Sequence, residues 1–282
     1  MPETVVIQPR RSGFLSYLSD AWRERHLLSY FARDAVKSFH KETIIGWPWL
    51  FIRPLLPALM FAFLFRGIEK LQSASLPYVL YVLSGMVLIQ ISFFGLRRII
   101  RSVAGNAAIV GKKYFPRIIL PTAHLAVLLL QLGAGLLLLV IVTLIVMWSG
   151  KSVTISTPFQ MTWALVAIVI VLGFTFSIGA TLALFNTAAR DVRMSVSLIN
   201  AGLMFLSPVF YPITLIEEPT RSLILALNPL AVAVALFRYG LYSVPLDFAW
   251  YFVPVAIVSC VVYCLIAVIL FFRADPILAD LV

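Results

Sequence analysis

The sequence predicts an all-α membrane protein with six transmembrane helices, an N-terminal amphipathic interfacial helix and a re-entrant helical hairpin between the fifth and sixth spans. Of the 282 residues, 62% are hydrophobic and only 12% are charged, and the mean hydropathy is +1.01. A soluble domain is about half apolar and about a quarter charged, so it has no means of burying this much apolar surface. The apolar residues also recur in segments of about 20, the length that crosses the hydrocarbon core of a bilayer.

Residues 1–46 form an N-terminal cytoplasmic or interfacial region, because they are too polar for the bilayer core. Their apolar residues make two successive helical stripes with polar and basic residues opposite: Phe14, Leu15, Leu18 and Trp22, then Leu28, Phe31, Ala35 and Phe39. An apolar stripe with a basic opposite face is typical of a helix that lies in the membrane interface. A helix packed against a soluble partner is the alternative.

Residues 47–282 form the predicted transmembrane domain. We expect spans at about 47–66, 76–98, 119–149, 161–187, 194–211 and 248–272. With the N-terminus inside, sixteen Lys and Arg residues lie on the cytoplasmic side and five on the outer side, with Arg53 set aside within a span. Basic residues accumulate in cytoplasmic loops, so both termini of this multi-pass membrane protein are predicted to be cytoplasmic.

Residues 211–247 interrupt this pattern. They contain the adjacent carboxylates Glu217 and Glu218, followed by an apolar stretch that carries Pro229 and Arg238. A charged, proline-bearing stretch at membrane depth has to be sheltered by protein or by water. We therefore predict two short helices that enter from the outer face and return to it, in place of a seventh span.

The distribution of ionisable residues argues against several classes of function. None of the twelve carboxylates lies in the middle of a predicted span, whereas proton- and sodium-coupled transporters usually place an ionisable or unwound site there; an ion site made of backbone carbonyls stays an alternative. The three histidines are scattered, so we expect no metal site and no catalytic residues. The net charge of +10 fits positive cytoplasmic loops, and nucleic acid is not an expected partner.

The stretch Gly105–Lys113, "GNAAIVGKK", resembles a phosphate-binding P-loop only superficially. Five residues separate Gly105 from Gly111 where the motif has four, and Lys113 stands where Ser or Thr would bind Mg²⁺. No nucleotide site is predicted in this chain. The two inner loops, residues 102–117 and 186–193, are compact and charged enough to receive a partner, although solvated positive loops are the simpler interpretation.

Five stretches in order resemble the membrane subunit of type-2 ABC exporters, the permeases for O-antigen, capsule and wall teichoic acid. They are "ARDAVKSFHKETIIGWPWLFIRPLL" (32–56), "VGKKYFPRIILP" (110–121), "ARDV" (189–192), "LSPVFYP" (206–212) and "LNPLAVAVALFRYGLY" (227–242). The resemblance covers nearly the whole chain, and it implies a location in the cytoplasmic (inner) membrane of a bacterium. The stretch "IIGWPW" departs from the family, which usually has a Leu-Gly pair before a lone Trp.

The resemblance implies a homodimer that docks two copies of a separate cytoplasmic ATPase, which binds ATP and Mg²⁺ while this chain binds no cofactor. The two inner loops would be the coupling helices, and the coupling residues would be Lys112, Lys113, Tyr114, Phe115, Arg190, Asp191 and Arg193. The family also has two half-helices between its fifth and sixth spans that form an outer gate, in agreement with the hairpin predicted at 211–247.

The implied substrate is a glycan or polyol phosphate on an undecaprenyl diphosphate anchor, carried outward. Aromatic rings hold sugars weakly while a chain slides, and the candidates for the conduit and gate are Phe51, Phe61, Phe210, Tyr211, Phe237, Tyr239 and Tyr242. Arg53 and Arg97 are candidates for the diphosphate, with positive-inside bias as the alternative. Two other functions stay open: export of a small hydrophobic compound, and a stand-alone membrane glycan transferase or flippase.

Overall fold

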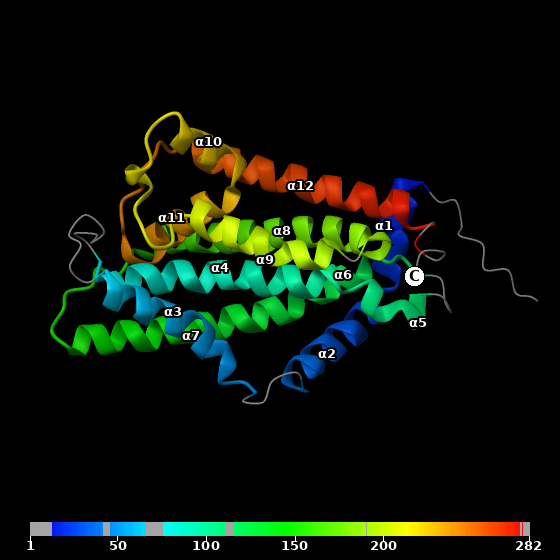
Figure 1. Cartoon of the computed structure of the whole chain (residues 1–282), viewed down its shortest axis with the longest axis horizontal. Helices are drawn as coiled ribbons and strands as arrows, with labels where there is room; N and C mark the ends of the chain where they lie inside the picture. The colour runs from blue at the N-terminus through cyan, green and yellow to red at the C-terminus, as the bar shows by residue number, and fades with distance from the viewer. Residues whose placement is uncertain are drawn as a thin grey trace, which may run out of the picture.

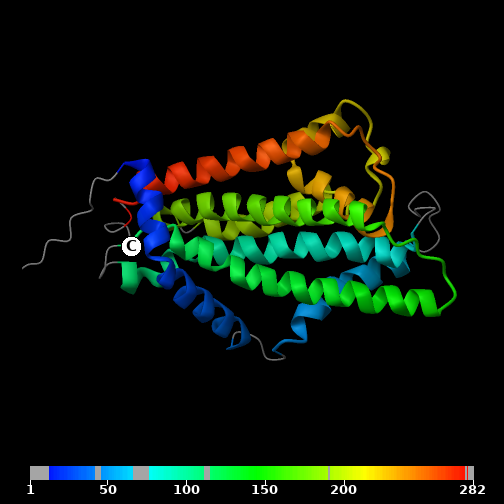
Figure 2. The ribbon, with the colours of Figure 1, turned by 180° about the vertical axis from the view of Figure 1, so that it is seen from behind.

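The structure is a computed structural model and describes residues 13–41, 46–65, 76–110, 115–189, 191–276 and 278. Within these residues the regular elements are helices. Four long helices lie side by side in Figure 1 and in the opposite view of Figure 2: α4 (Tyr78–Ile100), α7 (Leu125–Trp148), α8 (Pro158–Ala188) and α12 (Phe252–Ala274). We call the end at which α4, α8 and α12 begin the hairpin end, and the opposite end the loop end.

Four helical segments among the described residues are long and apolar enough to cross a membrane: Tyr78–Ile100, Ile119–Trp148, Pro158–Thr187 and Phe252–Ala274. The helices α3 (Trp49–Leu64) and α9 (Asp191–Leu206) are apolar but have only 16 residues each. At 1.5 Å per residue they are shorter than the roughly 30 Å hydrocarbon core. An all-α, multi-pass membrane protein is thus confirmed, and the count of six spans stays a prediction.

The helices α10 (Thr220–Leu227) and α11 (Pro229–Tyr242) meet at an angle of 89°. Counted as one bent span, this pair would make a fifth crossing. Figure 1 shows, however, that α10 begins and α11 ends at the hairpin end, so the chain returns to the side from which it came. This course has the shape of the predicted hairpin.

Asn228 holds the corner between α10 and α11. Its side chain accepts a hydrogen bond from the Leu230 amide (3.1 Å) and donates to the Leu206 carbonyl and the Ser207 hydroxyl, both at 3.2 Å. Pro229 follows as the first residue of α11, where its missing N–H costs nothing. The corner is therefore fastened to the end of α9.

Small residues let α8 lie close to α4 and to α11. A Cβ on Gly95 of α4 would lie 2.5 Å from Thr175 of α8, and a Cβ on Gly240 of α11 would lie 2.5 Å from the Ala164 backbone nitrogen. Ser92 and Thr175 share a hydrogen bond of 2.8 Å across the first contact. Close backbone approach at small residues, with interhelical hydrogen bonds, is the usual packing of membrane helices.

The N-terminal region contains the helices α1 (Phe14–Arg23) and α2 (Arg25–Lys41). The two apolar stripes differ in their environment. Phe31, Ala35 and Phe39 of α2 are buried against the bundle, whereas Leu15 and Trp22 of α1 are exposed. The stripe of α2 is thus covered by the protein's own helices, and an interfacial position stays a prediction that α1 fits better than α2.

Short helices complete the two ends of the bundle. The elements η2 (Ala104–Asn106), α5 (Ala107–Val110) and α6 (Ile119–Ala123) follow α4 at the loop end. The element η3 (Ile213–Leu215) follows α9 at the hairpin end. Helix α9 ends at Leu206, whereas the predicted fifth span continued to residue 211.

Candidate functional site

Residues 207–212, directly after α9, form a non-helical segment that we call the gate segment. Pro208 and Pro212 cannot donate backbone hydrogen bonds, so a helix through both is disfavoured. The Val209 amide instead donates to the Ser207 carbonyl at 2.7 Å. The backbone carbonyls of this segment therefore lack the hydrogen bonds that a helix would provide, and they require donors from other parts of the protein.

Arg238 of α11 supplies two of these donors. Its Nη1 donates to the Pro208 carbonyl at 2.6 Å and its Nη2 to the Val209 carbonyl at 2.7 Å. Its Nε faces the Tyr81 carbonyl at 3.1 Å and the Ser84 hydroxyl at 3.3 Å. The side chain is only 2% exposed, so the protein itself shelters this charge.

Two tyrosines of α4 satisfy the next two carbonyls. Tyr78 Oη donates to the Phe210 carbonyl at 2.9 Å, and Tyr81 Oη donates to the Tyr211 carbonyl at 3.1 Å. Four successive carbonyls, residues 208–211, therefore accept side-chain hydrogen bonds from α11 and α4. We call Tyr78, Tyr81, Ser84 and Arg238 the Arg238 cluster; it fixes the path of the gate segment.

The Tyr81 ring also carries the guanidinium on its face, with the Arg238 Cζ 3.6 Å from the ring centroid. Such cation–π contacts are worth about 2 kcal/mol or more when desolvated. Gly85, one turn along α4, makes room for this arrangement, since a Cβ there would lie 2.7 Å from Arg238 Nη2 and 3.2 Å from the Val209 Cα. A side chain at residue 85 would displace the guanidinium.

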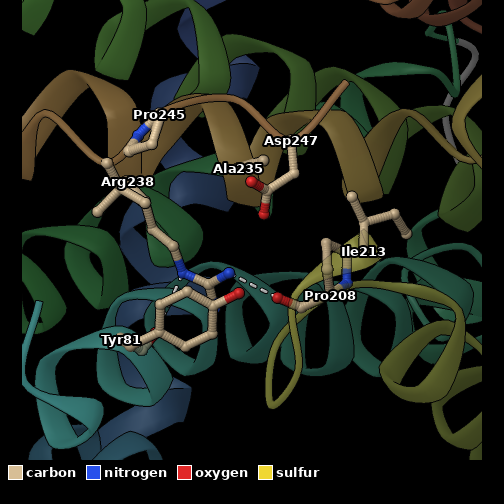
Figure 3. Close-up of a pocket in the computed structure, with 8 residues that line it drawn as sticks. Tyr81, Pro208, Ile213, Ala235, Arg238, Pro245 and Asp247 are labelled. Atoms are coloured by element: carbon tan, nitrogen blue, oxygen red, sulfur yellow. Dashed lines mark hydrogen bonds between the residues drawn. The ribbon is translucent and has the colours of Figure 1, made fainter. Parts of the chain in front are cut away.

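A small cavity of about 20 Å³ lies beside the Arg238 cluster, large enough for about one water molecule. Figure 3 shows the Asp247 carboxyl group pointing into this cavity, across from the Arg238 guanidinium and the Pro208 carbonyl. Burial raises the pKa of Asp247 above its usual value, and the positive charges of Arg238 and Arg221 oppose that shift. Asp247 is therefore a further polar group that faces the gate segment, in addition to the Arg238 cluster.

The structure brings three of the predicted conduit residues together. The Phe61 ring of α3 stacks on Phe210 with centroids 3.8 Å apart, and Tyr211 Oη donates to the Phe205 carbonyl at 2.5 Å. These aromatic residues join α3, the gate segment and α9 at the hairpin end.

The other four predicted conduit residues lie elsewhere. Phe51 is half-buried on α3, and Phe237 is fully enclosed in the core of the chain at 0% exposure. Tyr239 packs edge-on against Trp250 at 5.4 Å, and Tyr242 shares a 2.8 Å hydrogen bond with Thr143 of α7. Within the described parts of the chain, none of these four makes an aromatic or hydrogen-bonding contact with Phe61, Phe210 or Tyr211.

The loop end carries the described part of the predicted coupling residues. Phe115 is buried and stacks on Phe31 of α2 with centroids 5.8 Å apart, and Asp191 is exposed at the first position of α9. Four of the predicted coupling positions lie outside the described residues: Lys112, Lys113, Tyr114 and Arg190. The Arg193 side chain is likewise outside them.

Arg117 and Asp275 form a buried pair at the loop end that the sequence did not reveal. The Arg117 amide donates to Asp275 Oδ1 at 3.1 Å, and Arg117 Nη1 donates to the Asp275 carbonyl and lies 3.8 Å from Oδ1. Both residues are buried. The pair joins the end of the first inner loop to the C-terminal end of α12.

The two predicted diphosphate ligands differ in burial. Arg53 is half-buried, with its Cζ 5.1 Å from the Phe94 ring centroid and 5.8 Å from that of Trp49. Arg97 is exposed at the last turn of α4. Arg98 shares the Phe94 ring with Arg53, at 4.8 Å from its centroid, and also lies 5.3 Å from the centroid of Phe39.

Comparison with known proteins assigns the family. Residues 27–242 match the family model described as ABC-2 type transporter. The chain is 27% identical over 251 residues, 86% of this chain and 90% of the relative, to the O-antigen export system permease protein RfbA of Myxococcus xanthus. It is 26% identical over 227 residues, 79% and 81% of the two chains, to the protein of the same name from Klebsiella pneumoniae. With its apolar helical bundle, this chain belongs to the ABC-2 type transporter family of membrane permeases.

Proposed function

We propose that this chain is the membrane-spanning subunit of an ATP-driven exporter that moves undecaprenyl-diphosphate-linked polysaccharide from the cytoplasm to the outer side of the membrane. The observation that carries the proposal is the similarity to O-antigen export permeases over 86% of the chain. The functional unit is a homodimer with two copies of a cytoplasmic ABC ATPase, which binds and hydrolyses ATP with Mg²⁺. Both termini of this chain are on the cytoplasmic side.

The loop end is the side that receives the ATPase. Phe115 is anchored on α2 and Arg117 on α12, so the end of the first inner loop is rigidly connected to two helices. Asp191 begins α9, where a carboxylate is favoured by the helix dipole. Because α9 leads directly to the gate segment, a displacement of Asp191 by the ATPase would be transmitted along α9 to the hairpin end.

The hairpin end is the gate. The Phe61–Phe210 stack and Tyr211 offer aromatic faces, and such faces bind the C–H surfaces of sugars weakly enough for a chain to slide. The Arg238 cluster holds the same segment by its carbonyls, so the aromatic rings project from a fixed backbone.

The test of the proposed function is deletion of the gene followed by analysis of lipid-linked glycan. Full-length glycan accumulating on the cytoplasmic side, and restored export with the complementing gene, would support the proposal. Normal delivery of glycan to the cell surface would contradict it.

Replacement of Asp191 by Ala is expected to uncouple ATP hydrolysis from export without loss of folding, because the side chain is exposed. The measurement is ATP hydrolysis and glycan export by the reconstituted complex, with a reduction in exported glycan per ATP. Glu217→Ala, an exposed carboxylate at the opposite end, is the matched control. Equal export per ATP in the two variants would remove Asp191 from the coupling residues.

Replacement of Tyr211 by Ala is expected to impair passage of glycan or to let small ions leak, because it removes a ring from the gate segment. Tyr211→Phe keeps the ring and loses only the hydrogen bond to Phe205, so it should retain export. Ion flux through proteoliposomes and export in cells are the two readouts. A Tyr211→Ala variant as tight and as active as the wild type would assign Tyr211 to packing alone.

A further inference from the structure

A polar cavity of about 190 Å³ lies at the loop end, between α2, the end of α4, η2 and α6. We call it the Arg101 cavity. Its polar side chains are mostly hydrogen-bond donors: Ser38, Arg98, Arg101, Ser102, Asn106 and His124. Asp34 is the one carboxylate among the described residues that line it, and this side chain is exposed. The donor set suits an anion.

Two donors of the Arg101 cavity, Arg98 and Asn106, are held in a fixed position by contacts with neighbouring residues. Arg98 Nη1 donates to the Ala35 carbonyl of α2 at 3.4 Å, and its guanidinium lies over the Phe39 and Phe94 rings. Asn106 donates to the Ser102 carbonyl at 2.8 Å. The cavity wall is therefore built across three separate segments of the chain.

Ser102 gives an independent indication of a ligand. It lines the Arg101 cavity and is only 2% exposed, yet its hydroxyl has no hydrogen-bond partner among the described residues. Buried polar atoms are usually satisfied by protein, water or a ligand. Arg101, the preceding residue, is exposed and makes no ion pair within the described parts of the chain.

The depth of the Arg101 cavity identifies the class of anion. The apolar span of α4 ends at Ile100, so Arg98 and Arg101 lie where hydrocarbon gives way to headgroups. Basic pockets at this depth on the cytoplasmic side attract anionic lipid headgroups, and guanidinium groups bind phosphate with paired, charge-assisted hydrogen bonds. A volume of about 190 Å³ accommodates a phosphate with its nearest substituents.

We propose that the Arg101 cavity binds the phosphate group of a lipid, with Arg98 and Arg101 as the cationic ligands and Ser102 as a buried donor. The phosphate can come from an anionic phospholipid of the membrane or from the diphosphate of a lipid-linked cargo. The first source does not depend on the proposed export of glycan. The bound lipid would join α2 to the end of α4 and so brace the first inner loop.

The test is lipid binding to the purified full-length protein in a zwitterionic detergent, followed by native mass spectrometry and by the melting temperature. The probes are phosphatidylglycerol, phosphatidylcholine and undecaprenyl diphosphate, each added separately. We expect phosphatidylglycerol to bind more tightly than phosphatidylcholine. Arg101→Gln should weaken that binding about tenfold, the loss expected for one hydrogen bond to a charged group.

Arg273→Gln is the matched control, because Arg273 is another exposed cation at the loop end, in the last turn of α12, and it does not line the cavity. Ser102→Ala should weaken binding as Arg101→Gln does, and Asp34→Asn should strengthen it by removing a carboxylate from the cavity wall. Tight binding of undecaprenyl diphosphate alone would assign the site to the cargo. Equal effects of Arg273→Gln and Arg101→Gln, or equal binding of all three lipids, would overturn the proposal.

Discussion

Replacement of Arg238 by Gln is expected to lower the stability of the protein by about 3 kcal/mol or more and to open the gate end to small ions. The guanidinium satisfies the carbonyls of Pro208 and Val209, and a shorter side chain leaves both without a donor. Each buried polar group left unsatisfied costs about 1–3 kcal/mol. The cation–π contact with Tyr81 is lost as well.

The measurements for Arg238→Gln are the melting temperature in detergent and the ion flux through proteoliposomes. Arg238→Lys separates charge from geometry, because lysine keeps the positive charge but lacks the planar group that reaches two carbonyls at once. Its melting temperature and its tightness to ions should lie between those of Arg238→Gln and the wild type. Arg221→Gln on α10 is the control, since Arg221 belongs to an exposed pair with Glu218 and exposed pairs contribute about 0–1 kcal/mol. Equal melting temperatures for Arg238→Gln and Arg221→Gln would contradict this role for the Arg238 cluster.

Replacement of Asp275 by Ala is expected to destabilise the loop end by about 3–5 kcal/mol, the usual cost of removing one partner from a buried ion pair. Arg117 would remain buried with its positive charge facing the vacated position. Because this pair connects the first inner loop to α12, ATP-coupled export should fall further than the melting temperature alone predicts.

A double-mutant cycle tests the Arg117–Asp275 pair directly. Arg117→Ala and Asp275→Ala should each lower the melting temperature strongly, and the double variant should be less destabilised than the sum of the two. Arg273→Ala is the control, since this arginine is exposed two residues earlier on α12. Strict additivity of the two single effects would show that the two side chains do not interact.

For Arg238, the sequence predicted that the charge is sheltered but not which residues bind it. A charged residue after Pro229 in an apolar stretch predicted a sheltered site, and the structure places it at 2% exposure. The sequence did not indicate its partners, because Pro208 lies 30 residues away and Tyr81 lies 157 residues away. Tyr78 and Tyr81 stand three residues apart on one helix face, and this spacing is a local sign of two hydroxyl donors directed to the same side.

The N-terminal region illustrates a limit of hydrophobic periodicity. The stripes on α1 and α2 are alike in pattern, and both predicted helices in the membrane interface. Phe31 and Phe39 of α2 are nevertheless buried by the bundle, whereas Trp22 of α1 is exposed. Periodicity shows that one face of a helix is apolar, but it does not show whether protein or lipid covers that face.

The sequence by itself determined the all-α membrane class, the approximate positions of the long helices and the need to shelter Arg238, because hydropathy, length and the cost of a buried charge are properties of contiguous residues. Only the tertiary structure decided which carbonyls Arg238 binds, that Arg117 meets Asp275, and which aromatic rings gather around the gate segment. These contacts join residues that are far apart in the chain. They depend on how the helices pack against one another, which the hydropathy and spacing of a single segment do not specify.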